Sequence, residues 1–166
     1  MKCDPGRCEE CKPGNTYIHP WGNPGAGIAI VGEQPAMDHA SLSECAFAMD
    51  SEGNHGRSKL ILSAVFSTLG LQFEDYYWTN AYKCASRLSF DEEWSCSDLL
   101  EEELEDFQLA IALGNEAGKV LSGTHIEHEQ IWHPAFVLRD PEHFDEYVEQ
   151  WRSALQREHR TLSDFE

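Results

Sequence analysis

Short apolar runs alternate with amphipathic stretches along most of this chain. Ile28 to Val31 is an uninterrupted apolar run that stops at Gly32, which is typical of a strand buried on both faces. Residues 76–79 and 109–113 form similar short runs, and a fourth short strand is expected to include Ile131. Because stretches with helical spacing lie between these runs, the pattern predicts strands that alternate with helices.

The first two expected helices lie on either side of the second strand. One spans 59–69 and ends at Gly70, a residue type that commonly caps helix C-termini. The other is expected to begin at Asp91, a suitable N-cap, and to run to about Phe107. The expected inward positions of the first helix are Leu60, Ile61, Ala64, Val65 and Leu69.

Two further helices are expected in the last third of the chain. Gly114 opens the first of them, and the second follows Asp140 and Pro141, which suit an N-cap and a first helical position. The apolar positions of the last helix are Phe144, Tyr147, Val148, Trp151 and Leu155.

The alternation of strands and helices predicts an α/β fold with a central, mostly parallel four-stranded sheet. The length of 166 residues suits a single domain. Residues 1–27 carry much of the Gly and Pro and are expected to form an irregular, cysteine-bearing arm of that domain. Residues 33–56 are polar and are expected to form a long loop, which in a compact domain is usually functional.

Charge is the most unusual property of the composition. The 12 Lys and Arg residues face 30 Asp and Glu residues, giving a net charge of -18. Such a chain repels phosphate backbones at ordinary salt, so charge by itself argues against nucleic-acid binding. There is no apolar run long enough for a bilayer and no signal-peptide pattern at the start, so a cytoplasmic protein is expected.

Four of the six cysteines have a spacing that suggests a metal site. Cys8 and Cys11 form a C-x-x-C pair on the arm, while Cys84 follows the second strand and Cys96 lies within the next expected helix. Four thiolates can hold a tetrahedral zinc ion or a four-iron cluster. Small buried cysteines would be an ordinary alternative for the last two. Of the other two cysteines, Cys3 could replace a ligand, and Cys45 is interpreted as a bystander.

Polar residues also follow three of the predicted strands. Gly32 and Glu33 follow the first strand, Asn80 ends the second, and His133 follows the fourth. Ligands of parallel sheets bind at the carboxyl ends of the strands, where a carboxylate, an amide and an imidazole could act together. Taken alone, Glu33 and Asn80 could belong to ordinary turns, and His133 could be an ordinary surface residue.

At this point the sequence resembles the uracil-DNA glycosylase superfamily, in particular its iron–sulfur, family 4-like branch. The matching stretches are the C-x-x-C pair at 8–11, the strand and G-E-x-P motif at 28–35, the T-N-x-x-K-C motif at 79–84, Cys96, the strand and helix start at 110–117, and the His-Pro and Leu-Arg pairs at 132–139. The resemblance implies a three-layer α/β/α fold and a [4Fe–4S] cluster on Cys8, Cys11, Cys84 and Cys96, with zinc as the alternative.

The resemblance also implies the activity and the site. Uracil flipped out of DNA would be cut from its sugar, with Glu33, or Asp38 in second place, activating water and His133 donating to the uracil oxygen. Asn80 would read the base edge. The remaining residues implied to bind the substrate are Gly32, Gln34, Pro35 and Phe47.

Some positions depart from the family pattern. Ala36 and Ala135 stand where the family usually has Gly and Ser, and the segment whose Phe stacks on uracil is not intact. These departures favour an alternative, in which a weak or inactive relative serves as a DNA-binding or replication-associated module. A second alternative is an acidic interaction protein with a four-cysteine zinc site.

The acidity has an explanation that is compatible with DNA binding. Excess acidic residues are typical of proteins from very salty cytoplasm, and at about 1 M salt the Debye length is only about 3 Å. The acidity therefore predicts a halophilic origin. The uracil-containing DNA that the resemblance implies would be bound through short-range interactions, and the protein is expected to be a monomer. The basic residues expected to form a local phosphate patch are Arg57, Lys59, Lys83, Arg87 and Arg139.

Overall fold

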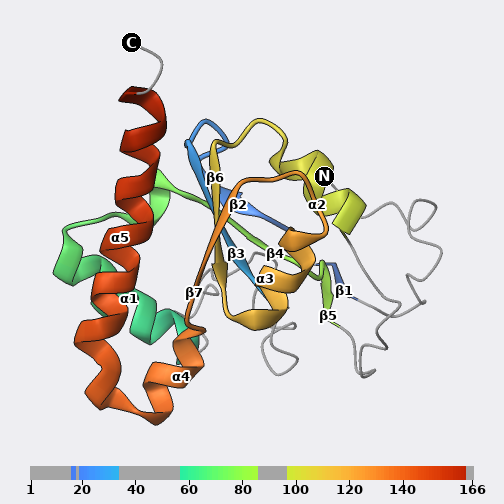
Figure 1. The fold of residues 1–166 in the computed structure, drawn as a ribbon. Coiled ribbons are helices and arrows are strands. Elements are labelled where there is room, and N and C mark those ends of the chain that lie inside the picture. Colours follow the sequence, from blue (N-terminus) through green and yellow to red (C-terminus); the bar gives the residue numbers. More distant parts are fainter. Residues whose placement is uncertain (1–15, 18, 34–56, 86–96, 164–166) are drawn as a thin grey trace.

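The computed structural model describes residues 16–17, 19–33, 57–85 and 97–163. Its main element is a five-stranded sheet with the strand order β2-β4-β3-β6-β7 (Figure 1). Four neighbouring strands are parallel: β3 (Ile28–Gly32), β4 (Tyr77–Asn80), β6 (Leu109–Leu113) and β7 (His128–Ile131). The predicted parallel four-stranded sheet is therefore confirmed.

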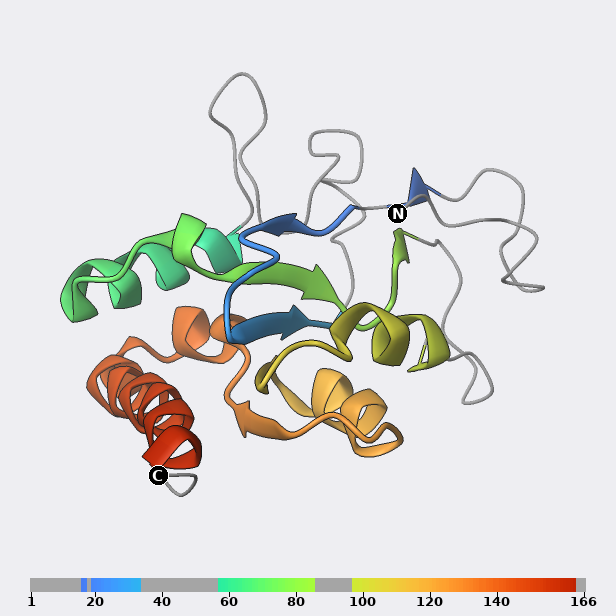
Figure 2. The ribbon, with the colours of Figure 1, turned by 90° about the horizontal axis from the view of Figure 1, so that it is seen from above.

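The sheet has one further edge strand that the sequence pattern did not predict. The two-residue strand β2 (Trp21–Gly22) pairs antiparallel with β4, in the direction opposite to β3 and β4 in Figure 2. Two residues are too few to show an alternating pattern of apolar and polar side chains. The strand is therefore recognised only from its backbone pairing with β4. A separate antiparallel pair joins β1 (Thr16–Tyr17) to β5 (Cys84–Ala85).

Helices cover both faces of the sheet, which gives the expected three layers (Figure 1). One face carries α1 (Arg57–Leu69), α4 (Pro134–Arg139) and α5 (Phe144–Ser163). The other face carries α2 (Ser97–Leu104) and α3 (Asn115–Ser122). Two short 3-10 turns, Phe73–Asp75 and Pro141–His143, precede β4 and α5.

The alternation of side chains along β3 and β6 separates two cores of different size. On the α1 and α5 face, both strands place Ile and Leu side chains against large aromatic residues such as Trp78 and Trp151. On the α2 and α3 face, the strands contribute mostly alanine, with Ala29, Ala110 and Ala112 beside the single larger Val31. Small methyl groups allow helices to approach a sheet closely, so the second layer lies over a shallow surface.

The prediction for α1 was right about the helix and wrong about two of its five inward positions. Leu60, expected inward, is 52% exposed, and Ala64 is also exposed. Val65 is buried as expected, Ile61 and Leu69 are partly buried against the core, and the structure also buries Leu62 and Phe66. Three consecutive apolar residues at 60–62 left the phase of the helix open, and the stripe that begins at Leu62 has the spacing of a true helical face.

Other boundaries follow the sequence more closely. Gly70 has a φ of 70°, as its expected capping role requires, and Gly114 precedes α3 as expected. Asp140 precedes the 3-10 turn that leads into α5, but its side chain makes no capping hydrogen bond, and α5 itself begins at Phe144 rather than at Pro141. The described part of the second expected helix begins at Ser97, and both Asp91 and Cys96 lie outside the described residues.

Candidate active site

The carboxyl ends of β3 and β4 hold Glu33 and Asn80 next to each other. Gly32 lies opposite Asn80 in the parallel register. Beyond the last paired residues, the Ala81 N–H donates to the Gly32 carbonyl at 2.8 Å and the Tyr82 N–H donates to the Glu33 carbonyl at 2.9 Å. These two bonds continue the ladder past both strands, so the backbone fixes the relative positions of the two predicted site residues.

The order of the strands changes direction at β3. The chain passes from β3 to β4 on one side and then crosses to β6 on the other side of β3. Ligands of open α/β sheets bind at the carboxyl ends of the strands beside such a change of direction. The side chains expected to act together therefore follow strands that flank this point or lie next to it.

Asn80 is suited to recognise a polar ligand. Its side chain is buried, with 5% of the residue exposed. A buried amide offers both donors and acceptors and is costly to leave unsatisfied. Asn80 thus favours a ligand that presents the complementary donor and acceptor pattern.

Glu33 is a half-buried carboxyl group of increased basicity. Burial raises the pKa of Glu33 above its ordinary value, and the nearby Glu116 carboxylate raises this pKa further. Both effects disfavour the negative charge on Glu33. A carboxylate in this state is a better proton acceptor than one in water, which suits the activation of a water molecule.

His133 begins α4 and acts as its N-cap. Its Nδ1 atom accepts a hydrogen bond from the Ala135 N–H at 3.1 Å, so a neutral ring carries its proton on Nε2. Burial lowers the pKa of His133, and the Arg139 charge lowers this pKa further. The imidazole is therefore neutral near pH 7, with one N–H left to donate.

Gly114 at the end of β6 makes room for this imidazole. A Cβ atom on Gly114 would lie 2.9 Å from the Cβ of His133 and 3.4 Å from its Cδ2. The φ of Gly114 is 93°, a conformation that side chains other than glycine rarely adopt. The sequence pattern placed Gly114 only at the start of a helix and did not reveal this contact.

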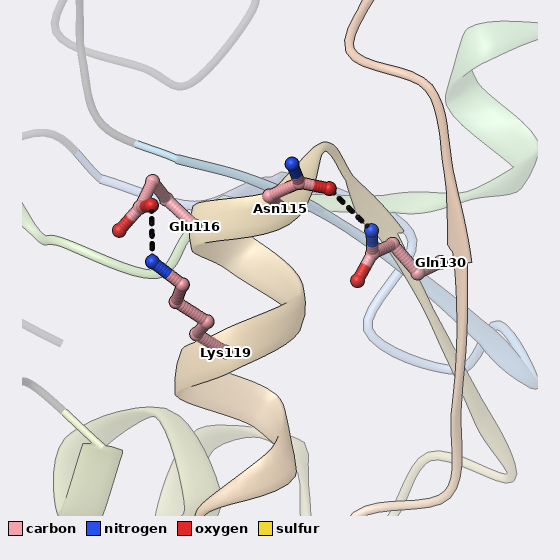
Figure 3. Close-up of polar contacts among 4 residues, drawn as sticks. All are labelled: Asn115, Glu116, Lys119 and Gln130. Carbon is pink, nitrogen blue, oxygen red and sulfur yellow. Dashed lines mark hydrogen bonds and ion pairs between the residues drawn. The ribbon is translucent and has the colours of Figure 1, made fainter.

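The first turn of α3 adds polar groups that the sequence pattern did not single out (Figure 3). The Gln130 amide donates to Asn115 Oδ1 at 2.7 Å, which joins α3 to β7. Lys119 pairs with Glu116 at 2.9 Å on the exposed side of the same helix. Asn115 and Glu116 come soon after β6 at the carboxyl edge, so the reasoning that found Glu33 and Asn80 could have included them.

Several predicted site residues lie outside the described residues. These are Gln34, Pro35, Asp38, Phe47, Cys8, Cys11 and Cys96. Cys84 is described as part of β5, where it pairs with Tyr17 of β1. This pairing places the backbone of Tyr17, in the N-terminal arm, opposite the backbone of Cys84.

The predicted phosphate patch is wrong for two of its five members. Lys83 is 1% exposed and pairs with Glu103. The Lys59 Nζ lies 3.7 Å from the centroid of the Phe73 ring, and burial lowers its pKa to about 8. A lysine stem is apolar enough to be buried when its ammonium group finds such partners, which a sequence pattern does not reveal. Arg139 is exposed beside the site.

The structure is that of an α/β protein whose sheet carries a carboxyl group, an amide and an imidazole after strands that end at the same edge. Residues 19–156 match the family model of the uracil DNA glycosylase superfamily, and the protein belongs to this superfamily. The chain is 28% identical over 170 residues to the type-4 uracil-DNA glycosylase of Archaeoglobus fulgidus, an alignment that covers 85% of this chain and 81% of the relative.

No helix among the described residues is both long and apolar enough to cross a membrane.

Proposed function

We propose that the protein is a uracil-DNA glycosylase, which hydrolyses the N-glycosidic bond between uracil and deoxyribose in DNA. The observation that carries this proposal is the state of His133, a neutral imidazole whose Nδ1 is occupied by the Ala135 N–H. Only Nε2–H remains to donate, as the negative charge that develops on a leaving uracil requires. The relative from Archaeoglobus fulgidus and the family match support the same activity.

The reaction follows from the placement of the three groups. The C1′–N1 bond breaks, the electron pair leaves with uracil, and the sugar becomes oxocarbenium-like. The His133 Nε2–H donates to a uracil carbonyl oxygen while negative charge builds there. Glu33 orients a water molecule and accepts its proton as the oxygen bonds to C1′. Asp38 is the second carboxylate in this proposal and lies outside the described residues.

Asn80 supplies the choice of base. Its amide can donate to a uracil carbonyl and accept from the uracil ring N–H at the same time. Cytosine presents a different pattern at this edge, which would leave a buried polar group of Asn80 unpaired. Backbone and side-chain groups of Gly32, Gln34, Pro35 and Phe47 complete the proposed base pocket.

A direct assay tests the activity. Purified protein is incubated with single- and double-stranded DNA that contains uracil, at low and high salt, and the abasic sites are counted. DNA with thymine in place of uracil is the control. Release of uracil alone is expected. Protein that binds this DNA but releases no uracil at any salt would contradict the proposal and favour the inert binding module.

The second alternative, an acidic interaction protein, required that Glu33, Asn80 and His133 not share a pocket. All three residues follow strands of one sheet at the same edge, at the ends of β3 and β4 and directly after β7, which supports a shared site. The family match also favours the glycosylase.

We further propose that Cys8, Cys11, Cys84 and Cys96 hold a [4Fe–4S] cluster. Four thiolates are the donor set that such a cluster requires, and the β1–β5 pair supports their convergence because Tyr17 lies opposite Cys84. The bound cluster would tie the N-terminal arm to the sheet and supply no step of the hydrolysis. A cysteine-ligated cluster fits a reducing compartment, so we propose a cytoplasmic enzyme that acts as a single-domain monomer.

Anaerobic purification is expected to yield brown protein with four irons and four sulfides per chain, because four thiolates bind one such cluster. Cys8→Ala is expected to lower both the iron content and the melting temperature, since a lost ligand frees the arm. Cys45→Ala, at a cysteine outside the proposed ligand set, is the matched control and should keep both. Stoichiometric zinc without iron under these conditions would contradict the cluster.

Added salt is expected to raise both the melting temperature and the affinity for DNA, which we attribute to a halophilic origin. The net charge of -18 repels itself and DNA, and raising the salt from 0.1 M to 1 M shortens the Debye length from about 10 Å to about 3 Å. Thermal melts and DNA-binding titrations over a series of KCl concentrations measure the effect. Sucrose at matched osmolality is the control. Binding that is strongest at low salt would show that this interpretation is wrong.

A further inference from the structure

Lys83 is a buried charge close to the proposed base pocket. It follows the turn after β4 and is 1% exposed. Its Nζ donates to the Thr79 hydroxyl oxygen at 2.7 Å and lies 2.5 Å from Glu103 Oε2. Thr79 precedes Asn80, and Glu103 lies in the last turn of α2. One ammonium group therefore connects the end of β4 with a helix that comes later in the chain.

Such an ion pair is an inefficient way to stabilise a fold. Both charges lose hydration when they are buried, and apolar residues of similar volume are often as stable or more stable. The second carboxylate oxygen of Glu103 is buried and has no hydrogen-bond partner among the described residues, so the compensation is incomplete. Stability alone is therefore a poor explanation for a lysine at this position.

The location of the pair offers a better explanation. The turn from Asn80 to Lys83 carries the two N–H groups, of Ala81 and Tyr82, that bind the carbonyls at the end of β3. Lys83 bonds back across this turn to Thr79 and outward to Glu103. The pair thus joins the last residues of β4, the turn and α2, and through the turn it also fixes Glu33.

We propose that Lys83 is a positioning residue, whose buried ion pair with Glu103 holds the turn after β4 and thereby orients Asn80 for base recognition. The role of Asn80 in this inference rests on the proposed function, whereas the ordering of the turn does not. The two polar contacts of the ammonium group are essential to this role. An apolar side chain could fill the same volume but could not bind both Thr79 and Glu103.

The test compares three variants with the wild type. Lys83→Met removes the ammonium group and leaves Glu103 buried without its partner, so a lower melting temperature is expected. Lys83→Met combined with Glu103→Met removes both charges, and the melting temperature is expected to return to the wild-type value or above it. Arg152→Met, which breaks the exposed pair with Glu149 on α5, is the matched control and is expected to change neither amide exchange nor inhibition by uracil.

Two measurements separate positioning from stability. Hydrogen exchange of the Ala81 and Tyr82 amides reports the order of the turn, and inhibition of cleavage by free uracil reports binding at Asn80. In the double variant we expect amide exchange at least tenfold faster than in the wild type and inhibition by uracil at least tenfold weaker, despite the recovered melting temperature. Thr79→Val, which keeps the side-chain volume and removes the acceptor, should show smaller changes in the same directions.

The outcomes distinguish this inference from the proposed function. If the double variant recovers its melting temperature together with wild-type exchange and wild-type uracil inhibition, the pair is only structural and the inference is overturned. If the wild type neither binds nor releases uracil, the proposed function fails, yet the exchange rates still decide whether the pair orders the turn. If the double variant does not fold, amide exchange and uracil inhibition in Thr79→Val decide whether Lys83 has the positioning role.

Discussion

His133→Ala is expected to slow the release of uracil by about 10²–10³-fold, the usual effect of removing one donor to a developing oxyanion. The donor is Nε2–H, because Nδ1 is held as an acceptor by the Ala135 N–H. The interaction strengthens as the bond to the sugar breaks, so the loss should appear in kcat and little in the affinity for DNA. Single-turnover kinetics with uracil-containing oligonucleotides measure it.

The same substitution removes the N-cap of α4, which costs about 1 kcal/mol of stability. His133→Asn is the control, because asparagine is a good N-cap but cannot place a donor where Nε2 lies. This variant should melt near the wild-type temperature and remain slow. Wild-type rates in His133→Asn would show that the cap, and not the donor, is what the reaction needs.

Glu33→Gln is expected to lower the cleavage rate by about 10²–10⁴-fold, because an amide cannot accept the proton of the attacking water. The pKa of Glu33 is raised by burial and by Glu116, so the wild-type rate should fall on acidification at a higher pH than for an ordinary glutamate. The pKa of His133 is lowered, so this histidine stays neutral over the same range. A pH–rate profile of kcat tests both statements.

The same pKa has a consequence for stability. A folded-state pKa above the unfolded value means that ionised Glu33 destabilises the fold at pH values above both. Glu33→Gln should therefore melt at a higher temperature than the wild type near pH 7, and the difference should vanish as the pH falls and Glu33 takes up its proton.

Glu116→Gln is the matched variant, since it removes one cause of the shift and should move the acid limb of the rate profile to lower pH. An unchanged Glu33→Gln rate would remove Glu33 from the mechanism.

The sequence was most informative where a single pattern determined the structure. Continuous apolar runs such as Ile28–Val31 and 109–113 can form strands in only one kind of environment, between two helical layers, so the parallel sheet was predictable. Gly32 opposite Asn80 then follows from the register, which is why the placement of Glu33 and Asn80 at the ends of adjacent strands could be predicted from the sequence alone.

The errors arose where partners distant in the sequence decide the outcome. Lysines such as Lys83 and Lys59 are expected on a basic surface. Both are buried here, because Lys83 pairs with Glu103 and the Lys59 ammonium group lies over the Phe73 ring. The contact of Gly114 with His133 likewise depends on two strands lying side by side. No local pattern contains this information, because spacing along one segment does not reveal which groups of another segment lie opposite.

The two faces of the sheet carry side chains of different size. This difference limits which substitutions the protein can accept near the carboxyl edge of the sheet. Ala110 and Ala112 are fully buried under the layer that contains α3, so their methyl groups act as spacers that set the height of this helix above the sheet. A larger residue at either position would lift the helix that follows Gly114 and so change the space around His133. The opposite face is filled by large side chains, which can exchange one apolar shape for another of similar volume. In descendants of this chain, the alanine face should therefore change in volume far less than the aromatic one.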